Sequence, residues 1–92
     1  MNKKEIIDEL SERVDLPKNS LKVIVEEAFD IIMEALVKDQ SVNIVGFGAF
    51  EVRQRAARRG RNPKTGTEIL IPETRTPAFR PSKNLTNAVK GR

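Results

Sequence analysis

The first half of the chain carries apolar residues at the spacing of one face of an α-helix. The first run predicts a helix over residues 3–13, and its apolar positions are Ile6, Ile7, Leu10 and Val14. Asn2, followed three residues later by Glu5, is typical of an N-cap with a capping-box partner. Pro17 disfavours a helical residue before it, so we expect the helix to end ahead of that proline.

A second run predicts a longer helix over about residues 18–38. Its apolar stripe is wide and consists of Leu21, Ile24, Val25, Ala28, Phe29, Ile32, Leu36 and Val37. Val23, Ile31 and Met33 add apolar surface outside the stripe, so we expect the helix to be buried on more than one side. In a chain this small, the second cover we expect is another copy of the protein. Neither Pro17 nor Lys18 is a side-chain cap of the Ser or Thr type, which leaves the first residue of this helix open.

The pattern changes to that of strands after residue 41. The segments 42–45 and 49–52 contain β-branched and apolar residues, and Gly46-Phe47-Gly48 between them can form a tight turn. We therefore expect a hairpin. Phe47, Phe50 and Phe79 are interpreted as core aromatics.

Residues 53–80 form two polar, extended stretches around the turn-forming sequence Gly60–Gly66. A tip near Pro63–Thr65 gives a register that pairs Phe50 with Phe79 and Val52 with Pro77. The middle then becomes a two-stranded arm, which spans about 30 Å at about 3.3 Å per residue. An isolated ribbon is marginally stable in water, so we expect the arm to be mobile until it binds a partner.

The chain closes with a third, short helix. Ser82 is a good N-cap, and Leu85, Ala88 and Val89 supply its apolar positions. We expect the last three residues, 90–92, to be disordered. The predicted order is helix, helix, strand, strand, arm, strand, helix, which is an α+β fold.

Composition narrows the possible functions. The 92 residues predict one domain with a marginal core, and without Cys it has no disulfides, which favours oligomerisation. The absence of His removes the commonest general base and metal ligand, and we expect neither a metal nor another cofactor. Glu51 and the pair Glu26-Glu27 have no obvious catalytic partner and are interpreted as surface carboxylates. We therefore expect that the protein is not an enzyme. No apolar run reaches the roughly 20 residues of a membrane span, and the charged first residues do not resemble a signal peptide. We therefore expect no membrane partner and a cytoplasmic location.

Charge is distributed unevenly along the chain. Residues 1–46 hold 6 Lys and Arg against 10 Asp and Glu, whereas residues 47–92 hold 11 against 3. The net charge of +4 therefore combines −4 in the first half with +8 in the second. Residues 53–64 contain six cations and no acid: Arg53, Arg55, Arg58, Arg59, Arg61 and Lys64. Guanidinium groups match phosphate oxygens bidentately, which indicates a nucleic-acid partner.

The arm suits duplex DNA better than single strands. Its cations can neutralise phosphates and release counterions, which gives sequence-tolerant affinity. Pro63 at the tip is a rigid apolar ring without an N–H group, and such a residue can wedge between base pairs and kink the duplex. Arg61, Asn62 and Lys64 beside it can hold phosphates or minor-groove acceptors. No aromatic residue lies between Phe50 and Phe79, which argues against a surface that stacks single-stranded bases.

These motifs together resemble the HU/IHF family of bacterial histone-like DNA-binding proteins over essentially the whole chain. The matching segments are residues 1–3, 46–53, Arg55, Arg58, 60–66, 71–72, 77–79 and 81–83. The resemblance implies an intertwined dimer, a homodimer or a heterodimer with a paralogue, with a helical body, a three-stranded antiparallel sheet per subunit and a long protruding β-ribbon arm. It implies a body of residues 1–52 and 76–92 and a DNA-binding arm of residues 53–75.

The resemblance also implies the residues that touch DNA. In the arm they are Arg53, Arg55, Arg58, Arg61, Asn62, Pro63, Lys64, Thr65 and Gly66, and we include Arg59 as a further basic candidate. Arg80 and Lys83 match positions on the body beneath the DNA, and Lys3 matches a contact to flanking duplex. The orientations of Arg59 and Arg75 stay open, because a bulge would change which cations share a face. The implied function is to wrap, bend and compact nucleoid DNA through the minor groove, with Pro63 as the wedge.

Three functions remain open at this point. One is an HU-like protein without sequence specificity, which the Arg80–Lys83 and Ile71–Phe79 patterns favour. Another is an IHF-like bender that prefers certain sequences. The third is a basic protein bound to RNA or the ribosome. Competition between duplexes, and between DNA and RNA, distinguishes them.

Overall fold

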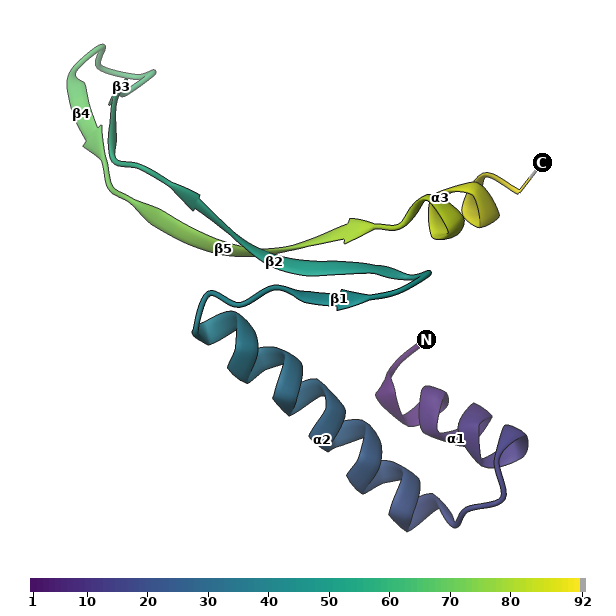
Figure 1. Cartoon of the computed structure of the whole chain (residues 1–92). Coiled ribbons are helices and arrows are strands. Elements are labelled where there is room, and N and C mark those ends of the chain that lie inside the picture. The colour runs from purple at the N-terminus through teal and green to yellow at the C-terminus, as the bar shows by residue number, and fades with distance from the viewer. Residues whose placement is uncertain (92) are drawn as a thin grey trace. The chain divides into compact units, whose positions relative to one another are not determined.

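The computed structural model describes residues 1–91, which divide into two compact units, Met1–Ala35 and residues 36–91. Each unit is described by itself. The elements, labelled in Figure 1, are α1 (Lys3–Arg13), α2 (Lys18–Val37), β1 (Val42–Ile44), β2 (Gly48–Arg55), β3 (Arg58–Arg61), β4 (Glu68–Ile71), β5 (Thr74–Pro81) and α3 (Lys83–Lys90). The predicted order of elements is confirmed, and α1 has the predicted bounds.

The first unit is a pair of helices held by a small core. Asn2 caps α1, since its Oδ1 accepts a hydrogen bond of 2.9 Å from the N–H of Glu5. Ile7 of α1 packs with Leu21 and Val25 of α2, and Leu10 lies against this cluster. The helix α2 begins at Lys18 without a Ser or Thr cap, and the Pro17 carbonyl accepts the N–H of Leu21 at 3.1 Å.

The second unit contains a three-stranded antiparallel sheet in the order β1-β2-β5. The predicted hairpin is confirmed, and Gly46 in its turn has a φ of 82°, a left-handed conformation that favours glycine. The predicted pairs, Phe50 with Phe79 and Val52 with Pro77, are confirmed as well. The strand β2 continues three residues beyond the predicted end, as far as Arg55.

Aromatic rings gather on one face of this sheet. The Phe79 ring centroid lies 5.4 Å from that of Phe47 and 5.0 Å from that of Phe50. A Cβ atom at Gly48 would lie 2.5 Å from the Phe79 ring and 2.7 Å from the Arg80 carbonyl oxygen. The close approach of β5 therefore requires a residue without a side chain at position 48.

The helix α3 begins and ends with the residues expected of its caps. The hydroxyl of Ser82 accepts the Leu85 N–H at 3.0 Å, and the Ser82 N–H donates to the Phe47 carbonyl at 2.9 Å, which ties the helix start to the hairpin turn. Lys90 is the last helical residue and Gly91 is the C-cap with a φ of 73°. The expected disorder is therefore wrong for these two residues, and Arg92 lies outside the described residues.

A single chain leaves much of its apolar surface uncovered. Six apolar side chains of α2 are at least half-exposed: Val23, Ile24, Phe29, Ile31, Met33 and Val37. Only Ile7, Leu21, Val25 and Ala49 are buried among the apolar residues of positions 1–91. The wide apolar surface expected for the second helix is therefore present, and one chain does not bury it.

Candidate nucleic-acid interface

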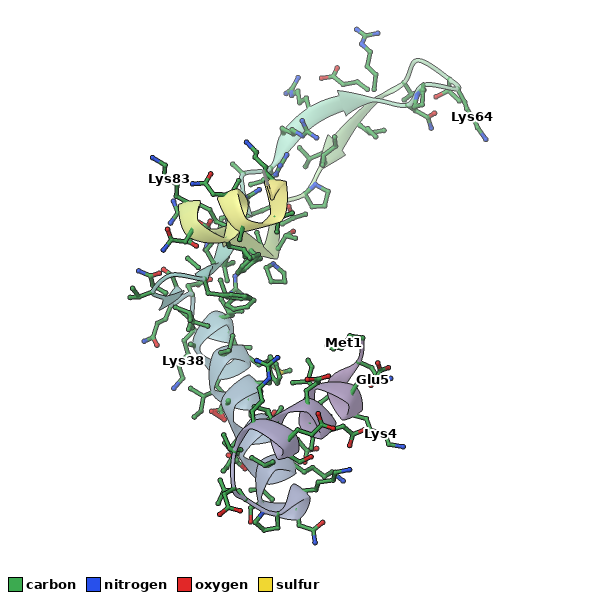
Figure 2. All side chains as sticks on the ribbon, turned by 90° about the vertical axis from the view of Figure 1, so that its right-hand side faces the viewer. Met1, Lys4, Glu5, Lys38, Lys64 and Lys83 are labelled. Carbon is green, nitrogen blue, oxygen red and sulfur yellow. The ribbon has the colours of Figure 1, made fainter. Side chains whose placement is uncertain are left out.

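The distal part of the arm is a hairpin of β3 and β4 closed by an ordered turn. The Asn62 N–H donates to the Thr67 carbonyl at 2.9 Å, and the Gly66 N–H donates to the Asn62 carbonyl at 2.8 Å. The Asn62 side chain accepts the Lys64 N–H at 2.9 Å, which fixes the backbone around Pro63. Figure 2 shows Lys64 at the far end of this hairpin. The predicted tip is thus a hydrogen-bonded turn that displays Pro63 and Lys64.

The ladder of the arm is interrupted, whereas a continuous ribbon was expected. Pairing stops at Arg55 with Thr74 and resumes at Arg58 with Ile71. Two residues on each strand are left out of the ladder: Ala56, Ala57, Pro72 and Glu73. Pro72 has no N–H to donate to a ladder, which accounts for the break at this point. Because both strands skip the same number of residues, the register continues without a bulge.

The proximal cations share one face of the sheet. In an antiparallel pair, directly opposed residues lie on the same face and successive residues alternate. Arg53, Arg55 and Arg80 therefore lie on the face opposite to the Phe50–Phe79 cluster. Lys83 is the first residue of α3, which follows β5 after the single residue Ser82 (Figure 2). The strand register thus separates a cationic face from an aromatic one.

The distal cations divide between the two faces of the hairpin. Arg59 and Arg61 lie on one face with Glu68, and Nη1 of Arg59 is 3.0 Å from Oε1 of Glu68. Arg59, Gly60, Arg61 and Glu68 line a shallow pocket there. Arg58 lies on the other face with Ile71, whose side chain covers Gly60. Because the register has no bulge, the side chains of Arg59 and Arg61 lie on the same face of the hairpin. The sequence alone had left the orientation of Arg59 open.

Three of the predicted contact residues already have acidic partners. Lys3 Nζ lies 3.1 Å from Glu26 Oε2 within the first unit, and Arg80 Nε lies 3.6 Å from Glu51 Oε1 within the second; Arg59 has Glu68. Exposed pairs of this kind are each worth about 0–1 kcal/mol. Within residues 1–91 no ion pair involves the other six cations: Arg53, Arg55, Arg58, Arg61, Lys64 and Lys83. These six carry the uncompensated charge of the candidate interface.

Arg75 does not join the cationic face. It pairs with Gln54 in the ladder, on the face of Phe50 and Phe79, and its guanidinium binds Asp39. No sequence pattern indicated this contact, because 36 residues separate its partners.

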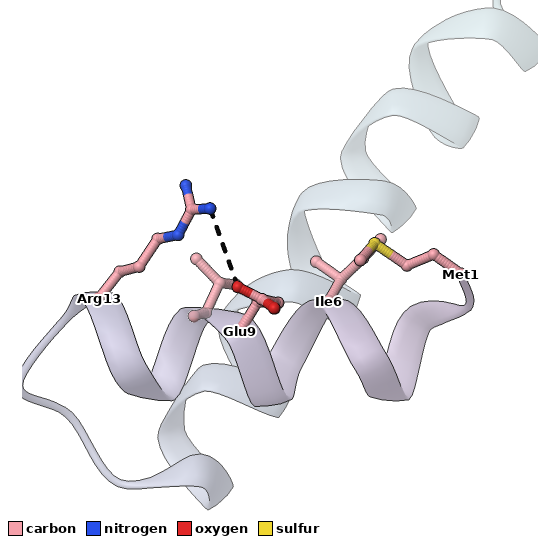
Figure 3. A pocket seen from close by; sticks show the side chains of 5 residues that line it. Met1, Ile6, Glu9 and Arg13 are labelled. Atoms are coloured by element: carbon pink, nitrogen blue, oxygen red, sulfur yellow. Dashed lines mark ion pairs between the residues drawn. The ribbon is translucent and has the colours of Figure 1, made fainter.

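A further hollow lies on α1. Met1, Ile6, Glu9, Leu10 and Arg13 line it, and Figure 3 shows their side chains, with all but Leu10 labelled. An ion pair of 3.8 Å joins Arg13 to Glu9. Across residues 1–91, no group of His, Cys, Asp or Glu side chains is placed to hold a metal ion. The same residues include no helix that is long and apolar enough to cross a membrane.

Comparison with known proteins agrees with this geometry. A family model described as "Bacterial DNA-binding protein" matches residues 1–90. The chain is 51% identical over 90 residues to DNA-binding protein HU-1 of Halalkalibacterium halodurans, covering 98% of this chain and 100% of that protein. It is 52% identical over 92 residues to the SPbeta prophage-derived DNA-binding protein HU 2 of Bacillus subtilis, with full coverage of both.

Solved structures of similar chains share the fold. A cocrystal structure of Anabaena HU with DNA superposes with a TM-score of 0.84 at 40% identity and covers 100% of both chains. HU from Thermotoga maritima superposes with a TM-score of 0.68 at 32% identity, covering 97% of this chain and 98% of that one. The protein described here is therefore a member of the family of bacterial DNA-binding proteins to which HU belongs.

Proposed function

We propose that this protein is an architectural DNA-binding protein of the HU type, which bends and compacts duplex DNA through the minor groove with little sequence preference. The observation that carries this proposal is the arm. It is a narrow hairpin that carries five cations without an acidic partner within residues 1–91 and ends in an ordered Asn62–Gly66 turn; these cations are Arg53, Arg55, Arg58, Arg61 and Lys64. The protein acts by binding and is not an enzyme.

Affinity comes mainly from phosphate neutralisation. Arg53 and Arg55 share one face with Arg80, and Lys83 follows at the start of α3. Each phosphate that such a cation neutralises releases counterions, and this gain in free energy does not depend on the bases. Proximal arm and body thus offer one surface to the duplex backbone, while Lys3 contacts flanking DNA once the duplex bends.

The tip supplies the bend. Its contacts come from Asn62, Lys64, Thr65 and Gly66, together with Arg59 and Arg61, and Pro63 inserts as the wedge between base pairs. The Asn62 hydrogen bonds support this role because they hold Pro63 at the end of the hairpin. Unstacking a base step costs a few kcal/mol, which the additional contacts of a bent duplex offset.

The dimer body and the DNA-binding arm correspond to separate ranges of the chain. Residues 1–52 and 76–92 form the body, and residues 53–75 form the DNA-binding arm. A second copy of the chain covers the apolar side chains of α2 that one chain leaves exposed, which makes the protein a homodimer. A protein with this activity resides on the cytoplasmic nucleoid.

A gel shift with linear, nicked and cruciform duplexes of equal length tests the function. Bending DNA that is already distorted requires less free energy than bending linear DNA, so an architectural protein binds the distorted forms more tightly. We expect nicked and cruciform duplexes to shift at lower protein concentration. Equal affinity for all three forms contradicts the proposal, and equal affinity for an RNA duplex favours the RNA-binding alternative.

A further inference from the structure

The guanidinium of Arg75 binds two different parts of the chain. Its Nε donates to Oδ1 of Asp39 at 3.1 Å, and its Nη2 donates to the same oxygen at 2.6 Å. The same Nη2 also donates to the carbonyl of Val37 at 3.2 Å. One side chain therefore joins β5 to both the last residue of α2 and the turn that follows it.

The backbone around Asp39 is shaped for this contact. Asp39 has a φ of 61°, and its N–H donates to the Leu36 carbonyl at 3.0 Å, which closes the end of α2. A left-handed residue in this place is typical of a helix C-terminus, where aspartate is tolerated better than most residues. The Val37 carbonyl belongs to the last turn, whose carbonyls lack helical partners and attract cations.

The position of Arg75 in the sheet shows that this contact lies at the root of the arm. Arg75 pairs with Gln54, and the next pair, Arg55 with Thr74, is the last one before the ladder breaks. The contact therefore supports β5 at the root of the arm, one pair from the point where the paired strands end. Arg75 also lies on the face opposite to Arg53 and Arg55, away from the cationic face.

We propose that Arg75 is a positioning residue that clamps the root of the arm to the C-terminal turn of α2 through Asp39, and that it does not contact DNA phosphates. Without the clamp, the end of the β2–β5 ladder frays, and the distal hairpin is no longer presented in one direction. This inference rests on the proposed function, because its consequence is a change in DNA bending.

Two variants separate the clamp from a phosphate contact. Asp39→Gly keeps a residue suited to the positive φ and removes the carboxylate, and Arg75→Gln removes the guanidinium. If Arg75 is a clamp, both variants lower the DNA bend at saturating protein. The double variant then bends DNA as much as whichever single variant bends it less, because both changes remove the same contact. If Arg75 contacts phosphate, Asp39→Gly instead raises affinity because it removes an acid and frees the arginine.

Matched controls show what charge alone does. Glu12→Gln removes an acid that lies outside the arm and has no ion pair in the described residues, so we expect it to leave the DNA bend unchanged. Arg75→Lys keeps the charge without the fork, and we expect it to restore part of the bend that Arg75→Gln removes. A bend in Asp39→Gly equal to that of the wild-type protein overturns the proposal.

A measurement on the protein without DNA tests the clamp independently of the proposed DNA-bending function. We expect amide hydrogen exchange in the last two pairs of the β2–β5 ladder to be roughly twofold to fivefold faster in Asp39→Gly, the range that an exposed ion pair supplies. Exchange in α1 remains unchanged. Uniform acceleration, or none, overturns the clamp. If the wild-type protein does not bend DNA, the proposed function fails, while this exchange measurement still decides whether the clamp exists.

Discussion

Individual cations of this protein differ in what surrounds them more than in their charge. Arg53, Arg55 and Arg58 have no acidic partner within residues 1–91, while Arg59 faces Glu68 and Arg75 binds Asp39. Residues that look alike in a basic segment therefore have different surroundings. Under the proposed function, we expect the unpaired cations to supply most of the affinity for DNA and the paired ones to contribute less charge to the interface.

Arg55→Ala tests the first group. We expect the variant to bind all duplex sequences more weakly and to reduce the slope of log K against log salt by about 0.9 for each phosphate that is no longer neutralised. Gln54→Ala is the matched control, since Gln54 lies on the opposite face of the same strand. Titrations at several salt concentrations measure both. Weaker binding to certain sequences alone would indicate that Arg55 reads bases.

Pro63→Ala tests the wedge. We expect the bend of a bound duplex to decrease more than the affinity, because the arm cations remain while the rigid apolar ring is removed. Fluorescence transfer between the duplex ends reports the bend, and binding isotherms report the affinity. Equal bending by the variant would remove the wedge role from Pro63.

At the scale of elements, local patterns predicted most of the structure. The spacing of apolar residues predicted α1 and α3, and the turn at Gly60–Gly66 predicted the register that pairs Phe50 with Phe79. The break beside Pro72 was missed, although a proline without an N–H was its visible cause. The Arg75–Asp39 contact could not be predicted, because it depends on where two distant elements meet.

Two glycines in the sheets provide a matched test of the close contact between β2 and β5 at Gly48. Gly48→Ala places its methyl group against the Phe79 ring and the Arg80 carbonyl, so we expect a decrease of about 1–3 kcal/mol in the free energy of unfolding. Gly60→Ala meets only the end of the flexible Ile71 side chain at 2.7 Å, so we expect a change within about 0.5 kcal/mol. Thermal and urea unfolding measure both. Equal effects would contradict the tight contact at Gly48.

For the whole molecule, the exposed apolar surface of α2 is the feature to explain. Val23, Phe29, Ile31 and Met33 are at least half-exposed in one chain, while only four apolar side chains within residues 1–91 are buried. A core this small is marginal in a chain of 92 residues, so we expect folding to be coupled to association with a second copy.

Coupled folding and association make stability depend on concentration. We expect the melting temperature to rise when the protein concentration is increased tenfold, because mass action favours the folded dimer. Calorimetry or circular dichroism at several concentrations measures it. A melting temperature that does not change with concentration would contradict an obligate dimer.

Bending of duplex DNA by the arms, whatever the DNA sequence, is the central property proposed for this protein. Its most direct test is fluorescence transfer between the two ends of short linear duplexes of unrelated sequence, titrated with the wild-type protein at one salt concentration. We predict that transfer rises to a similar plateau, at similar protein concentrations, for every duplex. No rise in transfer, or a rise confined to one sequence that binds about 10³-fold more tightly than the others, would contradict this function.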